Sequence, residues 1–293
     1  MRVVVFGAGL FGKKYISECP QDVEIVAVCD NNKINKYSGF GYGIVSPSAI
    51  PNLDFDKVVI ALNTTTIAGI NNVRQIMCQL ELLGIDNSKI MVMCNDIESF
   101  RRFECPRVQF IYEFSRIVHE RNIEGAVAEC GVYQGDYAYH INNAFPDRKL
   151  YLFDTFEGFP VIDIEKEEIQ VQDELKWLNI PWKGTQHEDL VLFKLIHRHN
   201  VTIKKGYIPD TFASLDEGIF AYVHLDMDMY APTIAGLHFF APRMSKGGVI
   251  AVHDYCSGNE FYTGVRKAVH EFCNCSLVNY FPLGDGSSVV FLF

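Results

Sequence analysis

The sequence lacks the features that would mark a membrane or secreted protein. In its 293 residues, no apolar run approaches the roughly 20 residues that a membrane-spanning helix needs. The first residues turn into a glycine loop too early to form a secretory signal. Hydrophobic residues make up 48% and charged residues 21%, as in ordinary folded domains. We therefore expect a folded protein without a membrane span that works in the cytoplasm.

Paired cysteines are also missing. The nine cysteines are an odd number, and no Cys-x-x-Cys pair occurs. Cys273 and Cys275 lack the spaced partners that a zinc site requires. We expect neither a disulfide framework nor a structural zinc. Four other cysteines occur in apolar surroundings that are typical of free buried thiols, namely Cys29, Cys78, Cys94 and Cys130.

Positive charge is scarce, above all in the second part of the chain. The formal net charge is −10. Residues 1–105 carry 10 Lys and Arg against 11 Asp and Glu, whereas residues 106–293 carry 16 against 25. Such a field repels phosphate backbones, and no basic stripe with interleaved aromatic residues occurs. Nucleic acid is therefore not expected as a partner, while a small neutral or metal-bound substrate fits.

The chain does contain one local plan twice: an apolar strand, a glycine turn, a helix, and a second strand that ends in Asp. The first copy consists of Arg2–Phe6, Gly7–Gly12 and Val23–Cys29, with Asp30 at its end. In the dinucleotide-binding fingerprint, the glycines admit a phosphate and the acid accepts ribose hydroxyls. We predict that residues 1–105 form a small Rossmann-like nucleotide-binding domain. A nicotinamide cofactor, a nucleotide or nucleotide-sugar, and a purely structural or dimerising role are all open for it.

The second copy begins the domain predicted for residues 106–293. The strand Ala126–Glu129 leads into Gly131–Gly135, and the strand Lys149–Phe153 ends in Asp154. An acid on each side of the glycines suits S-adenosylmethionine, which has an amino-acid tail and a ribose but no pyrophosphate. The candidate cofactor-binding residues are Glu129, Gly131, Gly135, Asp154 and Thr155.

Further apolar strands complete this second domain. The last of them, Ser288–Phe293, lies at the C-terminus and fits the antiparallel edge of a seven-stranded sheet. The predicted fold class is therefore α/β, with two Rossmann-like domains, of which the C-terminal one is a seven-stranded class I methyltransferase sheet.

Polar clusters follow two of these strands. Phe220–Leu225 runs into Asp226, and Gly248–Val252 runs into His253 and Asp254. Because the carboxyl ends of parallel strands share one edge of a sheet, we expect these side chains near the glycine loop. Such a cluster suits Mg²⁺ or Mn²⁺, and an ion bound to a hydroxyl would lower its pKa while a carboxylate takes the proton. Candidate metal ligands are Asp226, His253 and Asp254, and candidate bases are Asp226 and His253, with a histidine that merely ends a strand as the structural alternative.

The stretch Glu157–Asp189 shows poor periodicity and contains Trp177 and Trp182. A loop of that length in a compact domain is usually a lid or a binding loop. Its acidic half, Asp163–Glu174, is equally compatible with a solvated surface insertion.

At the glycine loop and at the polar clusters that follow the strands, the sequence resembles the macrocin O-methyltransferase family, enzymes that methylate sugar hydroxyls. The resemblance implies that Glu129, Gly131, Gly135 and Asp154 bind S-adenosylmethionine, with Asp226 as metal ligand and base and Asp254 as a second ligand. The family usually has two adjacent acids where this chain has His253-Asp254. One negative charge is thus missing from the implied site, which favours Mn²⁺ over Mg²⁺ or a metal-free enzyme with His253 as base. The matching segments run from about Pro106 to the C-terminus and include Ala128–Gly135, Tyr151–Pro160, Gly206–Phe212, His224–Tyr230, Ser245–Gly248 and His253–Tyr255.

The N-terminal part is similar to small nucleotide-sugar-binding domains fused to enzymes of bacterial polysaccharide modification, through Gly7–Gly12, Asp30 and Ile44–Pro47. The expected function is therefore an S-adenosylmethionine-dependent sugar O-methyltransferase whose acceptor is nucleotide-linked or polymer-linked. Alternatives are a non-catalytic nucleotide or nucleotide-sugar binding module and a nicotinamide-dependent oxidoreductase. The oligomeric state is open, with a homodimer as one alternative.

Overall fold

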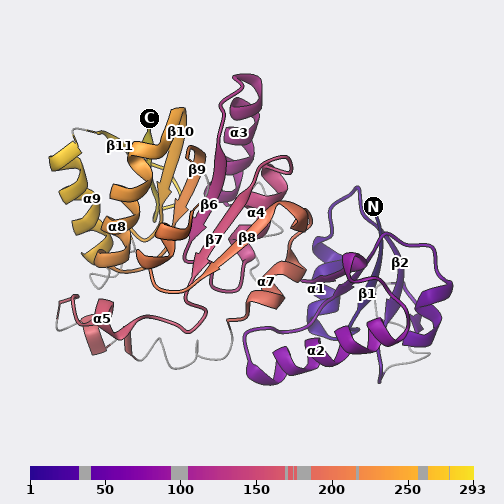
Figure 1. The fold of residues 1–293 in the computed structure, drawn as a ribbon. Helices are drawn as coiled ribbons and strands as arrows, with labels where there is room; N and C mark the ends of the chain where they lie inside the picture. Colours follow the sequence, from indigo (N-terminus) through magenta and orange to yellow (C-terminus); the bar gives the residue numbers. More distant parts are fainter. Residues whose placement is uncertain are drawn as a thin grey trace. The chain divides into compact units, whose positions relative to one another are not determined.

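The computed structural model describes residues 1–32, 41–93, 105–168, 171–173, 175–176, 186–215, 218–256, 263–276 and 278–293 (Figure 1). The chain forms two compact units. One unit contains Met1–Arg101 and Asp189–Ile196, and the other contains Arg102–Glu188 and His197–Phe293. Within the described ranges, no helix combines the length and the apolar character that crossing a membrane would require.

The first unit is built on a five-stranded parallel sheet of order β3-β2-β1-β4-β5. Its central strands are almost entirely buried, as expected for a parallel sheet with helices on its faces. The two-residue β3 was not predicted, because so short a strand leaves no periodic pattern. The elements are β1 Arg2–Phe6, α1 Leu10–Glu18, β2 Glu24–Cys29, β3 Ile44–Val45, β4 Lys57–Ile60, α2 Ile67–Leu82 and β5 Ile90–Val92, with 3-10 turns at Pro47–Asn52 and Asn87–Lys89.

A helix from far along the chain completes this unit. In α7 (Glu188–Lys194), Asp189 accepts hydrogen bonds from Arg74 on α2, at 3.2 Å to each carboxylate oxygen. Leu190 is 4% exposed and belongs to the same hydrophobic cluster as Met77 of α2. The segment Asp189–Ile196 therefore contributes both an ion pair and core packing to the first unit.

The second unit is a seven-stranded sheet of order β11-β12-β10-β9-β6-β7-β8. The pairs β10–β12 and β11–β12 are antiparallel and the other pairs are parallel. This confirms the predicted seven strands with an antiparallel edge, although the three-residue strand β11 was not itself predicted. The strands are β6 Ala126–Cys130, β7 Leu150–Asp154, β8 Val201–Lys205, β9 Phe220–Leu225, β10 Met244–Val252, β11 Tyr280–Pro282 and β12 Val289–Leu292.

Helices cover both faces of this sheet (Figure 1). Side chains alternate along β9. Val223 and Leu225 pack in one core with residues of α8 and α9, whereas Tyr222 contacts Phe114 of α3 on the other face. The residues that share the face of Tyr222 therefore lie toward α3 and α4. The helices are α3 Pro106–Glu120, α4 Asp136–Ala144, α5 Val161–Ile164, α8 Tyr230–Phe240 and α9 Thr263–Ser276, with 3-10 turns at Arg198–Asn200, Asp210–Ser214 and Ala241–Arg243.

The cysteine predictions hold in part. Cys29 and Cys130 are buried and free. Cys78 is exposed, so its predicted burial is wrong. It follows Met77 on α2, and a step of one residue turns a side chain by about 100°, away from the buried stripe of that helix. Cys94 lies outside the described residues.

The packing of α7 predicts the effect of Leu190→Ala. Removal of this buried side chain should lower the free energy of unfolding by about 2–5 kcal/mol, because it leaves a cavity beside α2. Urea unfolding would measure this loss, and amide exchange in α2 would locate it in the first unit. Leu192→Ala, at a partly exposed position of the same helix, is the matched control. Equal losses in both variants would contradict the packing role of Leu190.

Candidate active site

Polar side chains collect at the carboxyl edge of the second sheet. The strands β7, β6, β9 and β10 are neighbours in that order, and each ends in one of the predicted polar clusters. Asp154 ends β7, the glycine loop follows β6, and Asp226 follows β9. The edge prediction is confirmed, because clusters that lie far apart in the sequence follow adjacent strands.

The loop after β6 turns in a left-handed conformation three times within five residues. Gly131, Tyr133 and Gly135 have φ values of 86°, 50° and 80°. At Gly131, a Cβ atom would overlap the backbone carbonyl oxygen of Asp226, so this glycine lets β6 and β9 approach closely. Gly135 precedes α4, whose first turn carries the acidic Asp136. A negative charge at that helix terminus disfavours a phosphate ligand.

Asp154 braces the glycine loop. Its Oδ2 accepts hydrogen bonds from the amides of Val132 and Tyr133, at 2.7 and 2.8 Å, and its Oδ1 accepts one from Phe156, at 2.7 Å. Burial raises the pKa of the Asp154 carboxyl despite these bonds. The hydroxyl of Thr155 donates to a backbone carbonyl within its own turn, at 2.7 Å. Both side chains thus shape the loop, and their roles in cofactor binding stay predictions.

The side chain of Glu129 on β6 is fully buried in the second unit. It is 1% exposed, and its Oε1 lies 3.2 Å from Nδ1 of the fully buried His224 on β9. Among the described residues, Oε2 of Glu129 and Nε2 of His224 have no hydrogen-bond partner. Burial raises the pKa of the Glu129 carboxyl well above its usual range and lowers the pKa of His224 to about 3. Unpaired buried polar atoms are costly, so Oε2 of Glu129 is open to a hydrogen-bond donor.

Two helices cover this buried pair. The Tyr137 ring of α4 lies 4.1 Å from the His224 ring, and its hydroxyl lies 3.0 Å from that of Tyr222. Arg107 of α3 lies over the Tyr137 ring and pairs with Oδ2 of Asp226, at 3.2 Å. The sequence analysis missed Arg107 and Tyr137, because helical residues reveal their partners only after packing. The alternation of Tyr222, His224 and Asp226 along β9 was the available signal for a polar face.

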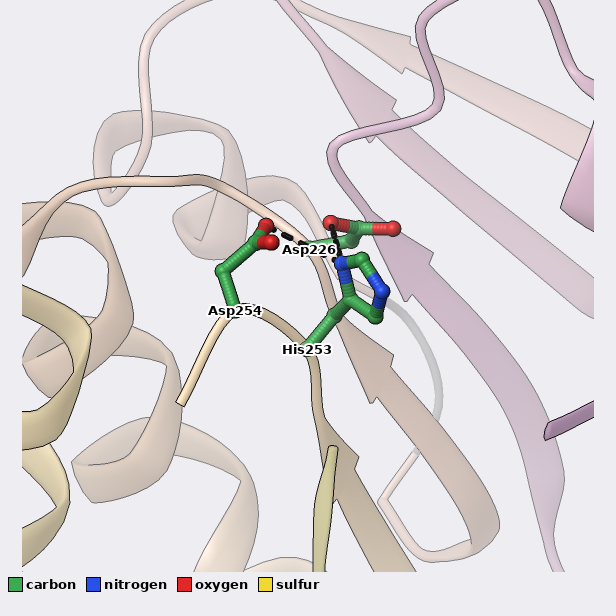
Figure 2. A group of neighbouring side chains, drawn as sticks. All are labelled: Asp226, His253 and Asp254. Atoms are coloured by element: carbon green, nitrogen blue, oxygen red, sulfur yellow. Dashed lines mark hydrogen bonds and ion pairs between the residues drawn. The ribbon is translucent and has the colours of Figure 1, made fainter. Parts of the chain in front are cut away.

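The three predicted metal ligands come together (Figure 2). Nδ1 of His253 lies 3.0 Å from Oδ1 of Asp226 and 3.0 Å from Oδ2 of Asp254. Burial alone would lower the pKa of His253, but Asp226 outweighs it and raises the pKa to about 10. Burial would likewise raise the pKa of Asp226, yet His253 holds it well below its usual range. The raised pKa favours the protonated form of His253 at neutral pH, with Nδ1 beside oxygens of Asp226 and Asp254.

Asp228 is a fourth acid at this edge that the sequence analysis did not select. Burial and the neighbouring Asp254 raise the pKa of its carboxyl well above the usual range. Asp228 and Asp254 both have left-handed backbones, with φ of 63° and 60°. Such conformations are uncommon for residues other than glycine and concentrate at functional sites. The spacing Asp226-x-Asp228 after a buried strand was the signal that could have found it.

The donor set fits a divalent cation. One atom each of Asp226, His253 and Asp254 lies within 4.8 Å of the others, which gives two carboxylate oxygens and one imidazole nitrogen. Two groups compete with such an ion: the proton on His253 occupies a ligand atom, and Arg107 pairs with Asp226. The three ligand atoms lie close enough to share one ion, but the His253 proton and Arg107 would have to be displaced first. The metal role of the three residues stays a prediction.

The close approach at Gly131 predicts the effect of Gly131→Ala. The new Cβ would overlap the Asp226 carbonyl in a left-handed backbone, so we expect a loss of at least about 2 kcal/mol in the free energy of unfolding. Urea denaturation would measure it. Gly218→Ala is the control, because nothing lies within 4 Å of its Cβ, and it should stay within about 0.5 kcal/mol of the parent. An equally small effect at Gly131 would contradict the described contact.

Comparison with known proteins identifies relatives of this chain. The chain is 28% identical over 160 residues to mycinamicin III 3''-O-methyltransferase of Micromonospora griseorubida. It is 25% identical over 159 residues to the 8-demethyl-8-(2,3-dimethoxy-alpha-L-rhamnosyl)-tetracenomycin-C 4'-O-methyltransferase of Streptomyces olivaceus. Each match covers 51% of this chain and only 61% and 58% of the respective relative. The solved O-methyltransferase NovP shares the fold, with a TM-score of 0.54 and 21% identity over 64% of this chain and 79% of NovP.

Two family models match successive parts of the chain. The model described as C2185-like, N-terminal, matches residues 1–91. The model described as macrocin-O-methyltransferase (TylF) matches residues 105–282, which is more than half of the sequence and includes every residue of the site described above. The chain therefore belongs to the macrocin O-methyltransferase family.

Proposed function

We propose that this protein is an S-adenosylmethionine-dependent O-methyltransferase that acts on a sugar hydroxyl in bacterial glycoside or polysaccharide modification. The observation that carries the proposal is Glu129, a buried carboxylate with one unpaired oxygen beside the glycine loop of a macrocin O-methyltransferase domain. A cationic ligand with an N–H donor would satisfy that oxygen. The amino-acid tail of S-adenosylmethionine has such a group.

The loop chemistry favours this cofactor over a dinucleotide. Asp136 in the first turn of α4 places a negative charge at the helix terminus, which is unfavourable for a pyrophosphate. Glu129 would accept from the ligand ammonium, while Asp154 would accept from a ribose hydroxyl with the lone pair that remains on its Oδ1. Gly131 and Gly135 would let the ligand approach the backbone.

The reaction needs a proton acceptor beside the acceptor sugar. A sugar hydroxyl oxygen attacks the methyl carbon in line with the sulfonium, the carbon–sulfur bond breaks, and S-adenosylhomocysteine leaves. The hydroxyl proton passes to the carboxylate of Asp226. His253 is the alternative base only in its neutral form, after it has lost its own proton. Positioning of the two reactants supplies much of the rate enhancement in such a transfer.

Metal assistance is part of the proposal. Asp226, His253 and Asp254 would hold Mg²⁺ or Mn²⁺. A bound ion would lower the pKa of the substrate hydroxyl. Because the histidine replaces a hard carboxylate, the donor set favours Mn²⁺ over Mg²⁺.

The acceptor class rests on both parts of the chain. Both relatives named above are O-methyltransferases by name, and the name of the second includes a dimethoxy-rhamnosyl group. In the first unit, Oδ2 of Asp30 accepts from the amide of Ala8 at 2.8 Å, the arrangement that Asp154 makes with its own loop. We propose that this unit is a Rossmann-like domain that binds a nucleotide or nucleotide-sugar, so a nucleotide-linked sugar is the preferred acceptor.

Isothermal titration of S-adenosylhomocysteine and, separately, of NADH into the full chain tests the proposal. We expect stoichiometric binding of S-adenosylhomocysteine. Tight NADH binding without any binding of S-adenosylhomocysteine would contradict the proposed function and support the oxidoreductase alternative.

Asp226→Asn should abolish the reaction without abolishing cofactor binding. Loss of the proton acceptor should lower turnover by about 100-fold or more, measured as release of S-adenosylhomocysteine with a panel of nucleotide-linked sugars and glycosides. The Kd of S-adenosylhomocysteine should change by no more than about threefold, which corresponds to less than about 1 kcal/mol of binding free energy. Asp210→Asn, at an exposed position of the same unit, should behave like the parent. Normal turnover in Asp226→Asn would rule out Asp226 as the base.

Glu129 should make cofactor binding dependent on pH. Its raised pKa keeps the carboxyl protonated to higher pH in the free protein, and a ligand ammonium favours the carboxylate. Binding should therefore release a proton, and affinity for S-adenosylhomocysteine should rise with pH up to the pKa of the free protein. Titration in buffers of different ionisation enthalpy measures the release. Glu129→Gln should lose the proton release, whereas Glu124→Gln, at an exposed position, should keep it. Undiminished proton release in Glu129→Gln would refute the proposed role of Glu129 in cofactor binding.

A further inference from the structure

A distant carboxylate caps the helix that follows Asp226. Glu167 lies in the segment after α5 and is 7% exposed. Its Oε1 accepts a hydrogen bond from the backbone amide of Tyr230, at 2.6 Å. Tyr230 is the first residue of α8, and the N-cap residue Met229 provides no side-chain hydrogen bond. Glu167 therefore takes over the capping of α8 from another part of the chain.

The same carboxylate touches the start of a second helix. Gly264 is the second residue of α9, and a Cβ atom there would overlap the Glu167 carboxylate. The first turn of a helix carries partial positive charge, so a negative group is stabilised against it. The carboxylate of Glu167 thus lies against the first turns of both α8 and α9, and the glycine at 264 makes room for it.

These two helices follow the two strands that carry the candidate site. α8 begins directly after the segment Asp226–Met229, and α9 is the next helix after His253 and Asp254. The carboxylate of Glu167 therefore contacts the first turns of both helices: α8, which follows Asp226, and α9, which follows His253 and Asp254 in the chain.

The segment that carries Glu167 is itself fixed. Ile164 is buried in one hydrophobic cluster with Met229 and two further residues of the segment, Val171 and Leu175. Asp163 is 1% exposed and accepts a hydrogen bond from the Tyr207 hydroxyl, at 2.8 Å. The alternative of a solvated insertion is wrong for these acids, because Asp163 and Glu167 are buried and bonded. Trp177 and Trp182 lie outside the described residues.

We propose that Glu167 is a positioning residue of the methyl-transfer site. By capping α8 and packing on the first turn of α9, it sets the distance between Asp226 and the pair His253–Asp254. The effect on turnover rests on the proposed function, whereas the effect on the backbone of the Asp226 segment does not.

Three variants of the full chain test this inference. Glu167→Ala removes the acceptor, and Glu167→Gln keeps an acceptor oxygen at the same reach. Glu165→Ala removes an exposed acid of the same segment and is the matched control. In Glu167→Ala, kcat should fall about 10- to 100-fold, as expected when catalytic groups are misplaced by about 1 Å. KM for S-adenosylmethionine and binding of S-adenosylhomocysteine should change less than kcat, because among the described residues Glu167 makes no direct contact with the cofactor residues and reaches the glycine loop only through the backbone of the Asp226 segment. Glu167→Gln should recover most of kcat.

Two results would overturn the inference: parental kcat in Glu167→Ala, or a loss in Glu167→Gln as large as in Glu167→Ala. If the parent shows neither turnover nor binding of S-adenosylhomocysteine, the proposed function fails, and amide hydrogen exchange of Asp226–Tyr230 then decides the inference. Faster exchange there in Glu167→Ala, but not in Glu167→Gln or Glu165→Ala, would support it. Equal exchange in all variants would refute it.

Discussion

The carboxylate and backbone of Asp226 are where the parts of the site meet. Its amide donates to the Cys130 carbonyl of β6, at 2.8 Å, and its own carbonyl fills the space left by Gly131. Its two carboxylate oxygens bind His253 from β10 and Arg107 from α3. A shift at this one residue would therefore disturb the glycine loop, the neighbouring strand end and the covering helix together. The geometry of the cofactor edge and that of the proton acceptor depend on the same close packing.

A polar layer inside the second unit explains how a buried charge is tolerated there. Tyr222, His224 and Asp226 share one face of β9, and Tyr137 packs on it from α4. Buried polar networks stabilise a single arrangement when every member is satisfied. Here Oε2 of Glu129 and Nε2 of His224 have no hydrogen-bond partner among the described residues, so the protein's own groups do not satisfy the layer fully. The unpaired oxygen of Glu129 lies where the cofactor is proposed to bind.

Sequence patterns predicted the parts of this structure that are encoded locally. Strand periodicity located β6, β7, β9 and β10, and the rule that parallel strands end at one edge brought Asp154, Asp226 and His253 to one place. What the sequence could not supply were contacts made by packing alone. Arg107 and Tyr137 reach the site from helices, and Glu167 caps a helix that begins 63 residues later. The pattern of Asp163–Glu174 also misled in part, because an acidic run in the sequence does not distinguish solvated acids from acids that are buried against helix termini.

The helix α7 gives the chain an interleaved order. Residues up to 101 belong to the first unit, 102–188 to the second, 189–196 to the first again, and 197–293 to the second. During synthesis, the first unit therefore cannot complete its core until Leu190 has been made, and two of the seven strands of the second sheet, β6 and β7, precede Leu190 in the chain. No single cut in the chain separates the two units whole. A cut between residues 101 and 102 would leave the first unit without the helix that carries Leu190.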